Sequence, residues 1–309
     1  LLLLSLASLA YLLCQNVAQL VGARVLHGLA AALVMPASLA YMGELSPKGK
    51  EAGHMGLFNA FFFGGLAAGP LLGGGLKDLW GMRSSFITMG VLAFFAFLVT
   101  SLALPHDRPW GGPRTMPHWR SLLRKRPLVG VLLIRFCFSV GIGITWTFLP
   151  LLATGRWGLS GSQIGLLISL NVLTAMLLQV PSGFLSDRLG KKGFVLVGGG
   201  IVALCLYLIP WSRSFRELLL LNLLFGISGG LSIPALMGIL VEEGKDLGGM
   251  GTVMGVTVMV HSFGMFLGPI FGGLVVDQIG IDGAFQAGAA LSLVGVLGFW
   301  GLYRRGQRG

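Results

Sequence analysis

The sequence predicts an all-α membrane protein built from two related helical halves, and three observations support this prediction. Apolar residues make up 54% of the chain and charged residues only 11%, and the mean hydropathy is +0.84, values typical of proteins that cross a membrane many times. Apolar runs of about 20 residues, the length that spans a bilayer, follow one another along the chain. A long glycine pattern occurs twice, and the second copy starts 199 residues after the first.

We expect ten membrane-spanning helices, because ten apolar runs alternate with short polar loops. In chain order these runs cover residues 1–13, 17–43, 53–76, 84–104, 128–153, 163–185, 194–210, 216–241, 250–275 and 284–303. The first run follows no Met and no basic segment, so a signal peptide is not predicted there.

The third and ninth runs carry the glycine pattern. Each copy has glycine, eight residues, glycine, three residues, Gly-Pro, two residues and Gly-Gly. Glycines four apart form a smooth stripe that lets another helix approach closely, and proline bends the helix. We predict two bent, closely packed helices, although a glycine stripe can be a packing device and nothing more. The residues assigned to this interface are Gly56, Gly65, Gly69, Pro70, Gly73 and Gly74 in the first copy, and Gly264, Gly268, Pro269 and Gly272 in the second.

The repeat extends beyond the glycines and divides the chain. At an offset of 198 residues, Pro36 corresponds to Pro234 and Glu44 to Glu242. We therefore predict an N-terminal bundle of four visible helices (1–104), a basic linker (105–127) and a C-terminal bundle of six helices (128–309). Applying the same offset to the start of the second half predicts two further helices before residue 1.

The distribution of basic residues predicts the orientation in the membrane. One set of loops and ends carries fifteen Lys or Arg, and the other carries five. Since cytoplasmic loops are enriched in Lys and Arg, both visible ends are expected to be cytoplasmic, in a bacterial-type inner membrane.

Several classes of function are disfavoured by the sequence. The net charge of +11 comes from residues in short loops between apolar runs, so we expect a lipid bilayer and no nucleic acid as partner. Cys14, Cys137 and Cys205 are far apart, so neither a disulfide framework nor a metal site is predicted. The chain has no GxxxxGK[ST] or HExxH motif, and we predict no enzyme activity, no catalytic residues and no cofactor.

The loop after the sixth run has a distinctive charge pattern, GFLSDRLGKK, from Gly183 to Lys192. An Asp followed by basic residues at a helix end can pair with acids on neighbouring helix ends, and such a cluster can act as a latch between two conformations. We predict this gating role for Asp187 and Arg188, with Glu242 or Glu243 as the acidic partner. Anchoring by positive charge alone remains the alternative for the two lysines.

These motifs resemble those of the major facilitator superfamily. GFLSDRLGKK is similar to its loop signature, the Gly56–Gly74 pattern is similar to the fifth-helix signature of its drug-proton antiporters, and Arg24-Val25-Leu26-His27-Gly28 is similar to its fourth-helix signature, with His27 in place of Gln. The resemblance implies two pseudo-symmetric six-helix bundles around a central cavity, of which helices 3 to 12 are visible here. It also implies that Asp187 and Arg188 act in the cytoplasmic gate.

Five residues are candidates for substrate handling or proton coupling. A buried cation in a membrane is costly unless it faces water or a partner, which singles out Arg24 and Arg135, although snorkelling could explain the latter. His261 could titrate or could be a hydrogen-bonded packing residue. His27 belongs to the fourth-helix motif, and Asn222 corresponds to Arg24 in the repeat.

We therefore predict a secondary transporter that works by alternating access, most simply as a monomer, and exports small amphipathic or drug-like molecules in exchange for protons. All eleven acidic residues lie in loops or at helix ends, so an uptake carrier or uniporter for a small metabolite is the alternative. A membrane protein without transport activity is a third possibility.

Overall fold

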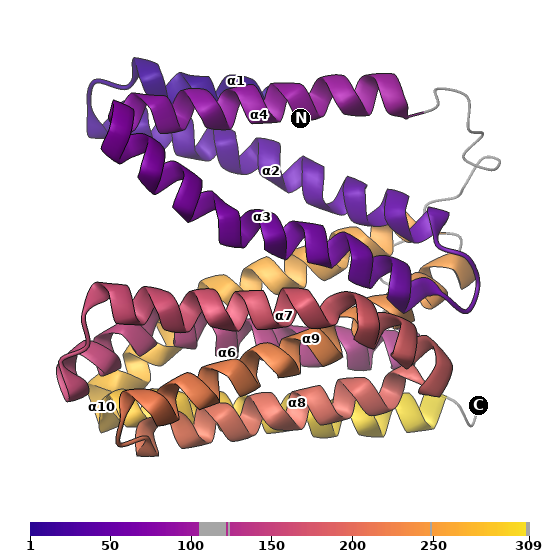
Figure 1. The fold of residues 1–309 in the computed structure, drawn as a ribbon. Helices are drawn as coiled ribbons and strands as arrows, with labels where there is room; N and C mark the ends of the chain where they lie inside the picture. Colours follow the sequence, from indigo (N-terminus) through magenta and orange to yellow (C-terminus); the bar gives the residue numbers. More distant parts are fainter. Residues whose placement is uncertain (105–121, 123, 248, 307–309) are drawn as a thin grey trace. The chain divides into compact units, whose positions relative to one another are not determined.

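The computed structural model describes residues 1–104, 122, 124–247 and 249–306, and within its helices it does not describe the side chains of residues 70, 71, 74, 75, 77, 78, 161, 162, 305 and 306. Most of the predicted linker therefore lies outside the described residues. All regular structure in the described residues is helical, with nine α-helices and two short 3₁₀ helices (Figure 1).

The helices follow the apolar runs of the sequence. They are α1 (Leu2–Ala10), η1 (Tyr11–Leu13), α2 (Val17–Leu45), α3 (Glu51–Trp80), α4 (Met82–Ala103), α6 (Arg126–Trp157), α7 (Gly161–Leu189), α8 (Lys191–Leu208), η2 (Ile209–Trp211), α9 (Phe215–Asp246) and α10 (Met250–Gly306).

Each predicted span lies on one of these helices, but the prediction of ten separate spans is wrong. The last two spans both lie in α10, which consists of two helical segments separated by a kink at Gly280, where φ is 82° and ψ is 173°. Among the described residues, seven helices are long and apolar enough to cross a membrane. The nine-residue α1 is too short to be one of them, and α3, in which six side chains lie outside the described residues, is not counted among them.

The chain forms two compact units. The first comprises Leu1–Leu39 and the described part of Gly65–Thr115, and the second comprises Ala40–Gly64 and the described part of Met116–Gly309. In the first unit α1 packs against α4, where the Ser5 hydroxyl donates a hydrogen bond of 2.8 Å to the Gly90 carbonyl. The end of α2 and the start of α3 thus pack with the second unit, a division different from the one drawn at the predicted linker.

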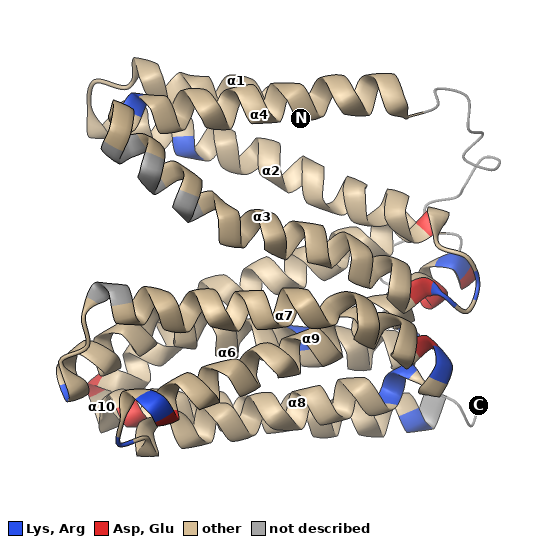
Figure 2. Ribbon diagram, viewed as in Figure 1, with Lys and Arg blue, Asp and Glu red and all other residues tan. Residues whose placement is uncertain are grey.

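In the second unit α6 packs along α10, α7 packs along α9, and α8 contacts both α9 and α10. Helices α6 and α9 are central, since 72% of the residues in the most apolar window of each are buried, against 17% in α10. Large apolar side chains remain exposed on the outer helices, as expected for surfaces that face lipid tails. Charged residues gather near the helix ends (Figure 2).

Candidate functional site

The GFLSDRLGKK loop forms a tight corner between α7 and α8. Gly190 is the only residue between the two helices and has φ of 100°, a conformation that L-residues with a side chain rarely adopt. The corner places Asp187 and Lys191 side by side, with 2.7 Å between the carboxylate and the ammonium nitrogen. The glycine of the motif therefore allows an ion pair to form across the end of one helix and the start of the next.

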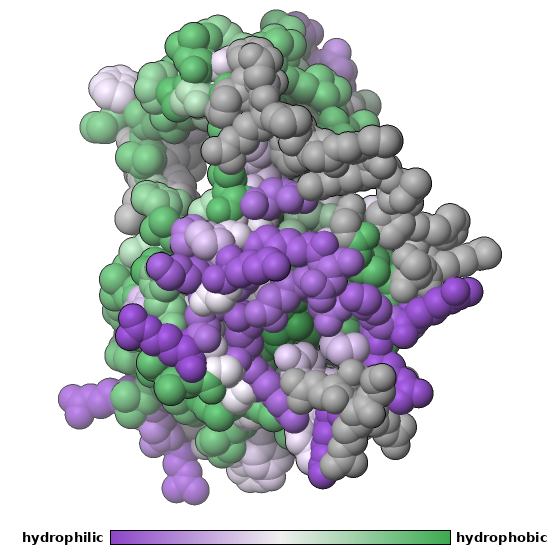
Figure 3. Space-filling model, turned by 90° about the vertical axis from the view of Figure 1, so that its right-hand side faces the viewer, coloured by the Kyte–Doolittle hydropathy of each residue, from purple (hydrophilic) through white to green (hydrophobic). Residues whose placement is uncertain are grey.

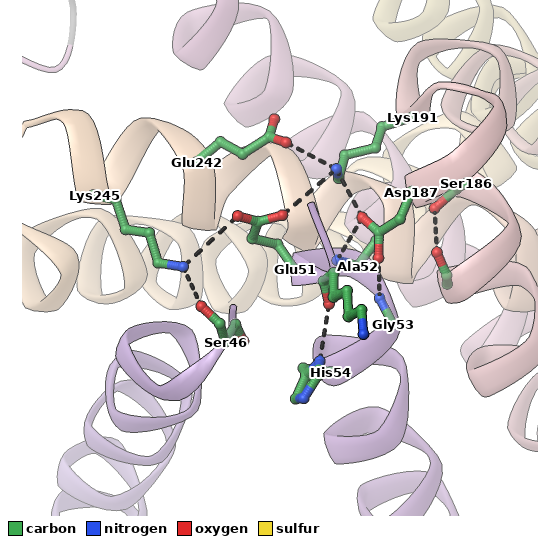
Figure 4. Close-up of polar contacts among 12 residues, drawn as sticks. Ser46, Glu51, Ala52, Gly53, His54, Ser186, Asp187, Lys191, Glu242 and Lys245 are labelled. Carbon is green, nitrogen blue, oxygen red and sulfur yellow. Dashed lines mark hydrogen bonds and ion pairs between the residues drawn. The ribbon is translucent and has the colours of Figure 1, made fainter. Parts of the chain in front are cut away.

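Asp187 also caps the start of α3. Its carboxylate accepts hydrogen bonds from the backbone N–H groups of Ala52 and Gly53, at 3.1 and 2.8 Å (Figure 4). These groups belong to the first turn of α3 and have no carbonyl partner within their own helix. A carboxylate at this position is also stabilised by the partial positive charge of the helix start. Asp187 thus joins two segments that are 134 residues apart in the chain.

Two lysines connect the remaining carboxylates. The Lys191 ammonium lies 2.8 Å from the Glu242 carboxylate and 3.9 Å from that of Glu51. Lys245 lies 3.7 Å from the other Glu51 oxygen and donates a hydrogen bond to the Ser46 carbonyl. We call Glu51, Asp187, Lys191, Glu242 and Lys245 the ion-pair cluster. It joins the start of α3 to the ends of α7 and α9 and the start of α8 (Figure 4).

Three glycines let α3 approach closely enough for these contacts. A Cβ atom at Gly183 would lie 2.5 Å from the Ala52 carbonyl oxygen, and one at Gly238 would lie 2.7 Å from the Ala52 Cβ. A side chain at Gly53 would overlap the Phe184 ring. The start of α3 therefore fits between α7 and α9 only because these positions lack side chains.

The cluster is closed to solvent at its centre and open at its rim. The side chains of Asp187 and Glu51 are each 3% exposed and that of Lys191 is 9% exposed, whereas the Glu242 side chain is 44% exposed. Figure 3 looks onto this end of the helices, where hydrophilic residues gather and hydrophobic residues border them. Breaking the pairs would therefore expose buried charges to water, as a conformational latch requires.

The predicted gate residues have different positions in this arrangement. Glu242 joins Asp187 through Lys191, whereas Glu243 pairs with Lys125 at 3.1 Å. Arg188 is exposed and makes no hydrogen bond or ion pair with any described residue, so its gating role stays a prediction.

Glu51 and Lys245 were not identified from the sequence. Glu51 is the first residue of α3, and acidic residues at helix ends are usually solvated. One signal in the sequence was available: Glu51 stands directly before a glycine-rich apolar run. Glycines allow helices to pack closely, and an acidic side chain beside such a contact becomes buried.

A second polar group lies inside the membrane-spanning part of the second unit. The Ser139 hydroxyl bonds the Arg135 carbonyl at 2.8 Å and the Nδ1 atom of His261 at 2.6 Å. Arg135 and Ser139 are one turn apart on α6, and His261 lies on α10. The structure thus brings together two of the predicted coupling candidates, and the connecting serine was not identified from the sequence.

The remaining candidates lie elsewhere. In the first unit the Arg24 guanidinium carbon is 5.2 Å from the centre of the Tyr11 ring, whose centre is 5.8 Å from that of the His27 ring. Asn222 is buried in α9, where its side-chain amide donates to the Leu218 carbonyl and its backbone carbonyl accepts from the Asn171 side chain. The side-chain amide of Asn222 is thus hydrogen-bonded within its own helix, and its role as a coupling candidate stays a prediction.

The two copies of the glycine pattern have different surroundings. In the second copy, Cβ atoms at Gly264 and Gly268 would lie 2.7 and 2.6 Å from Ser139 and Val140 of α6. The Met265 carbonyl, which Pro269 leaves without its helical partner, lies against Gly143 of α6.

In the first copy, Cβ atoms at Gly65, Gly69 and Gly73 would meet no described atom within 4 Å, whereas one at Gly56 would overlap the Gln179 carbonyl of α7. The side chains of Pro70 and Gly74 lie outside the described residues. The interface role of the first glycine stripe stays a prediction.

The sequence matches the profile of one protein family twice. Residues 1–155 and residues 131–308 each match the Major Facilitator Superfamily. The chain belongs to the Major Facilitator Superfamily. Members of this superfamily are membrane transporters rather than enzymes, which agrees with the function class predicted from the motifs.

Two relatives within the superfamily align with most of the chain. An uncharacterised MFS-type transporter of Methanocaldococcus jannaschii is 25% identical over 280 residues, which cover 88% of this chain and 71% of the relative. The multidrug resistance protein MdtG of Salmonella paratyphi A is 26% identical over 302 residues, which cover 95% of this chain and 74% of MdtG.

A solved structure supports the fold independently. The crystal structure of the human organic anion transporter MFSD10 (TETRAN) superposes with a TM-score of 0.76 over 96% of this chain and 74% of that protein, at 22% sequence identity. At this identity the likeness concerns the fold, and it agrees with the all-helical superfamily architecture expected from the sequence.

Proposed function

We propose that this superfamily member is a proton-coupled secondary transporter that exports small amphipathic or drug-like molecules by alternating access. The observation that carries the proposal is the ion-pair cluster, in which Asp187 and Lys191 hold the start of α3 against the ends of α7, α8 and α9. Such a cluster stabilises one conformation and must open in another. The similarity to a multidrug resistance protein over 95% of the chain supports the export of drug-like molecules.

In this proposal the cluster is the cytoplasmic gate of an inner-membrane protein, and both visible ends are cytoplasmic. Arg188, which is exposed beside Asp187, is assigned to the same gate. The candidates for substrate handling and coupling remain Arg24, His27, Arg135, Asn222 and His261. The described carboxylates lie near helix ends or beside the kink at Gly280, so the histidines are the proposed proton carriers.

The test is a flux measurement with the full-length gene product in liposomes. An imposed pH gradient should drive accumulation of an amphipathic fluorescent dye. Dye movement in one direction should in turn move protons in the other, and the change in lumenal pH should be proportional to the amount of dye transported. Dye movement that follows its own gradient and ignores the pH gradient would favour the uniporter alternative. If no dye and no proton moves with a correctly inserted protein, the transport proposal fails.

A further inference from the structure

Arg135 is a cation without a counter-ion in the interior of the second unit. Its Nε atom is buried and has no hydrogen-bond partner, and no acidic side chain among the described residues pairs with its guanidinium group. It is the tenth residue of α6, which places it about 14 Å along the helix and within the apolar part that crosses the bilayer core. An isolated charge at this depth is strongly unfavourable unless something supplies the opposite charge.

The second unit itself does not supply that charge. Its described carboxylates lie near helix ends, as Figure 2 shows, and most of them already have cationic or backbone partners. They are Glu44, Glu51, Asp187, Glu217, Glu242, Glu243, Asp246, Asp277 and Asp282. Snorkelling to the membrane surface is also an unsatisfactory explanation, because a snorkelling side chain extends along an exposed surface and the Nε of Arg135 is closed off.

His261 is held next to this cation in a fixed orientation. The Ser139 hydroxyl has a single proton, and when it donates to the Arg135 carbonyl it can only accept from Nδ1 of His261. The Nε2 atom then remains available for a proton and for a ligand. The close contact of Gly264 with Ser139 and with the Phe136 carbonyl keeps α10 and α6 at the short separation that this geometry needs.

We propose that Arg135 and His261 form an anion-recognition site within the membrane, and that the substrate carries a carboxylate, sulfonate or phosphate group. The guanidinium offers paired donors that match such oxygens, and an imidazolium adds a further donor. Lipid phosphates lie at the membrane surface, at a different depth from Arg135, so the ligand is a small molecule that enters the protein. This inference rests on the proposed transport function only in calling the bound anion a substrate.

The test uses one ring system with different charges. Binding to the purified full-length protein is measured for 1-naphthoate, naphthalene-1-sulfonate and 1-naphthyl phosphate, and for the matched alcohol 1-naphthylmethanol and cation 1-naphthylmethylammonium. At least one anion should bind more tightly than the alcohol and the cation. Arg135→Gln should weaken its binding about 10- to 100-fold, the loss expected for a charge-assisted hydrogen bond, and Arg135→Lys should weaken it less.

Three further variants separate this site from general effects. Ser139→Ala and His261→Gln should each weaken anion binding about 3- to 30-fold, because the first releases the imidazole from its fixed orientation and the second removes the imidazole. Arg213→Gln removes an equal charge from an exposed loop position and should leave binding unchanged. If Arg135→Gln does not fold, as judged by size-exclusion chromatography, Arg135→Lys and Ser139→Ala carry the test.

The outcomes distinguish the site from the transport proposal. Preferred binding of the cation, anion binding that survives the Arg135 and Ser139 substitutions, or no anion binding at all would overturn the inference. Anion binding that depends on Arg135 without any flux would support the site and contradict the proposed transport function. Flux of cationic dyes that persists in Arg135→Gln would support transport and contradict the site.

Discussion

At the scale of single residues, Lys191 decides how the cluster behaves. Its ammonium group lies within 4 Å of three carboxylates, contributed by α3, α7 and α9, and it is 9% exposed. A buried ion pair contributes little net stability compared with apolar packing, but removing one partner leaves an unpaired buried charge and is strongly unfavourable. The ion-pair cluster therefore favours one arrangement of the helices that it joins, and breaking its ion pairs can be coupled to a conformational change.

Replacing Asp187 with Asn should weaken the latch without affecting membrane insertion. The amide retains one acceptor for the N–H groups of α3 but loses the charge that pairs with Lys191, a loss on the order of 2 kcal/mol. We expect a lower unfolding temperature in detergent and transport slowed about tenfold, the effect of 1.4 kcal/mol on a rate.

The matched control for this change is Asp246→Asn. Asp246 is exposed at the end of α9, next to Lys245 in the sequence, and forms no ion pair within the described residues. Its replacement should change neither stability nor flux. Equal behaviour of the two variants would show that the loss of any acid at this end, rather than the latch, produces the effect.

At the scale of helices, α3 and α10 use the same glycine pattern differently. The second copy fits α10 against α6, while the first copy has only Gly56 in close contact within the part of the chain that the structure describes. The freed Met265 carbonyl on this bent helix faces Gly143 of α6, where a Cβ atom would lie only 3.0 Å from the carbonyl oxygen.

Replacing Gly268 with Ala should separate α10 from α6. A Cβ atom there would lie 2.6 Å from the Val140 carbonyl oxygen and 3.0 Å from the Gly143 Cα atom, and backbone atoms cannot move aside as a flexible side chain can. We expect a destabilisation of about 1–3 kcal/mol, seen as a lower unfolding temperature. Gly273→Ala on the same helix, where no described atom lies within 4 Å, should be neutral or slightly stabilising.

The helices could be predicted from sequence because apolar runs of bilayer length have few alternatives. Asp187 and Glu242 were also predicted as one cluster, because their charges stand at the ends of such runs. The burial of Glu51 could not be predicted, since it depends on glycines in α7 and α9 that are distant in sequence. The kink at Gly280 within α10 likewise depends on backbone angles that composition does not specify. The helices predicted before residue 1 stay a prediction.

At the scale of the whole molecule, the charges differ between the two ends of the second unit. The end with the ion-pair cluster has ten Lys or Arg among its described residues, and the opposite end has three. The ten are Lys48, Lys50, Arg124, Lys125, Arg126, Arg188, Lys191, Lys192, Lys245 and Arg304, and the three are Arg156, Arg213 and Arg216. Arg156 is also paired with Asp282 at 2.7 Å, so its charge is partly neutralised.

Reporter fusions should therefore place the ion-pair cluster on the cytoplasmic side. Lys and Arg near the ends of spans are retained in the cytoplasm, and the excess lies at the end where α7 meets α8. Alkaline phosphatase, which folds only outside the cytoplasm, should be active when fused after Gly158 and inactive when fused after Leu189. A fluorescent protein that fails to mature outside the cytoplasm should give the opposite pattern at the same two positions. If phosphatase were active after Leu189 instead, the cluster would face outward, and a gate built from it would close the exit of the transport path rather than its cytoplasmic entrance.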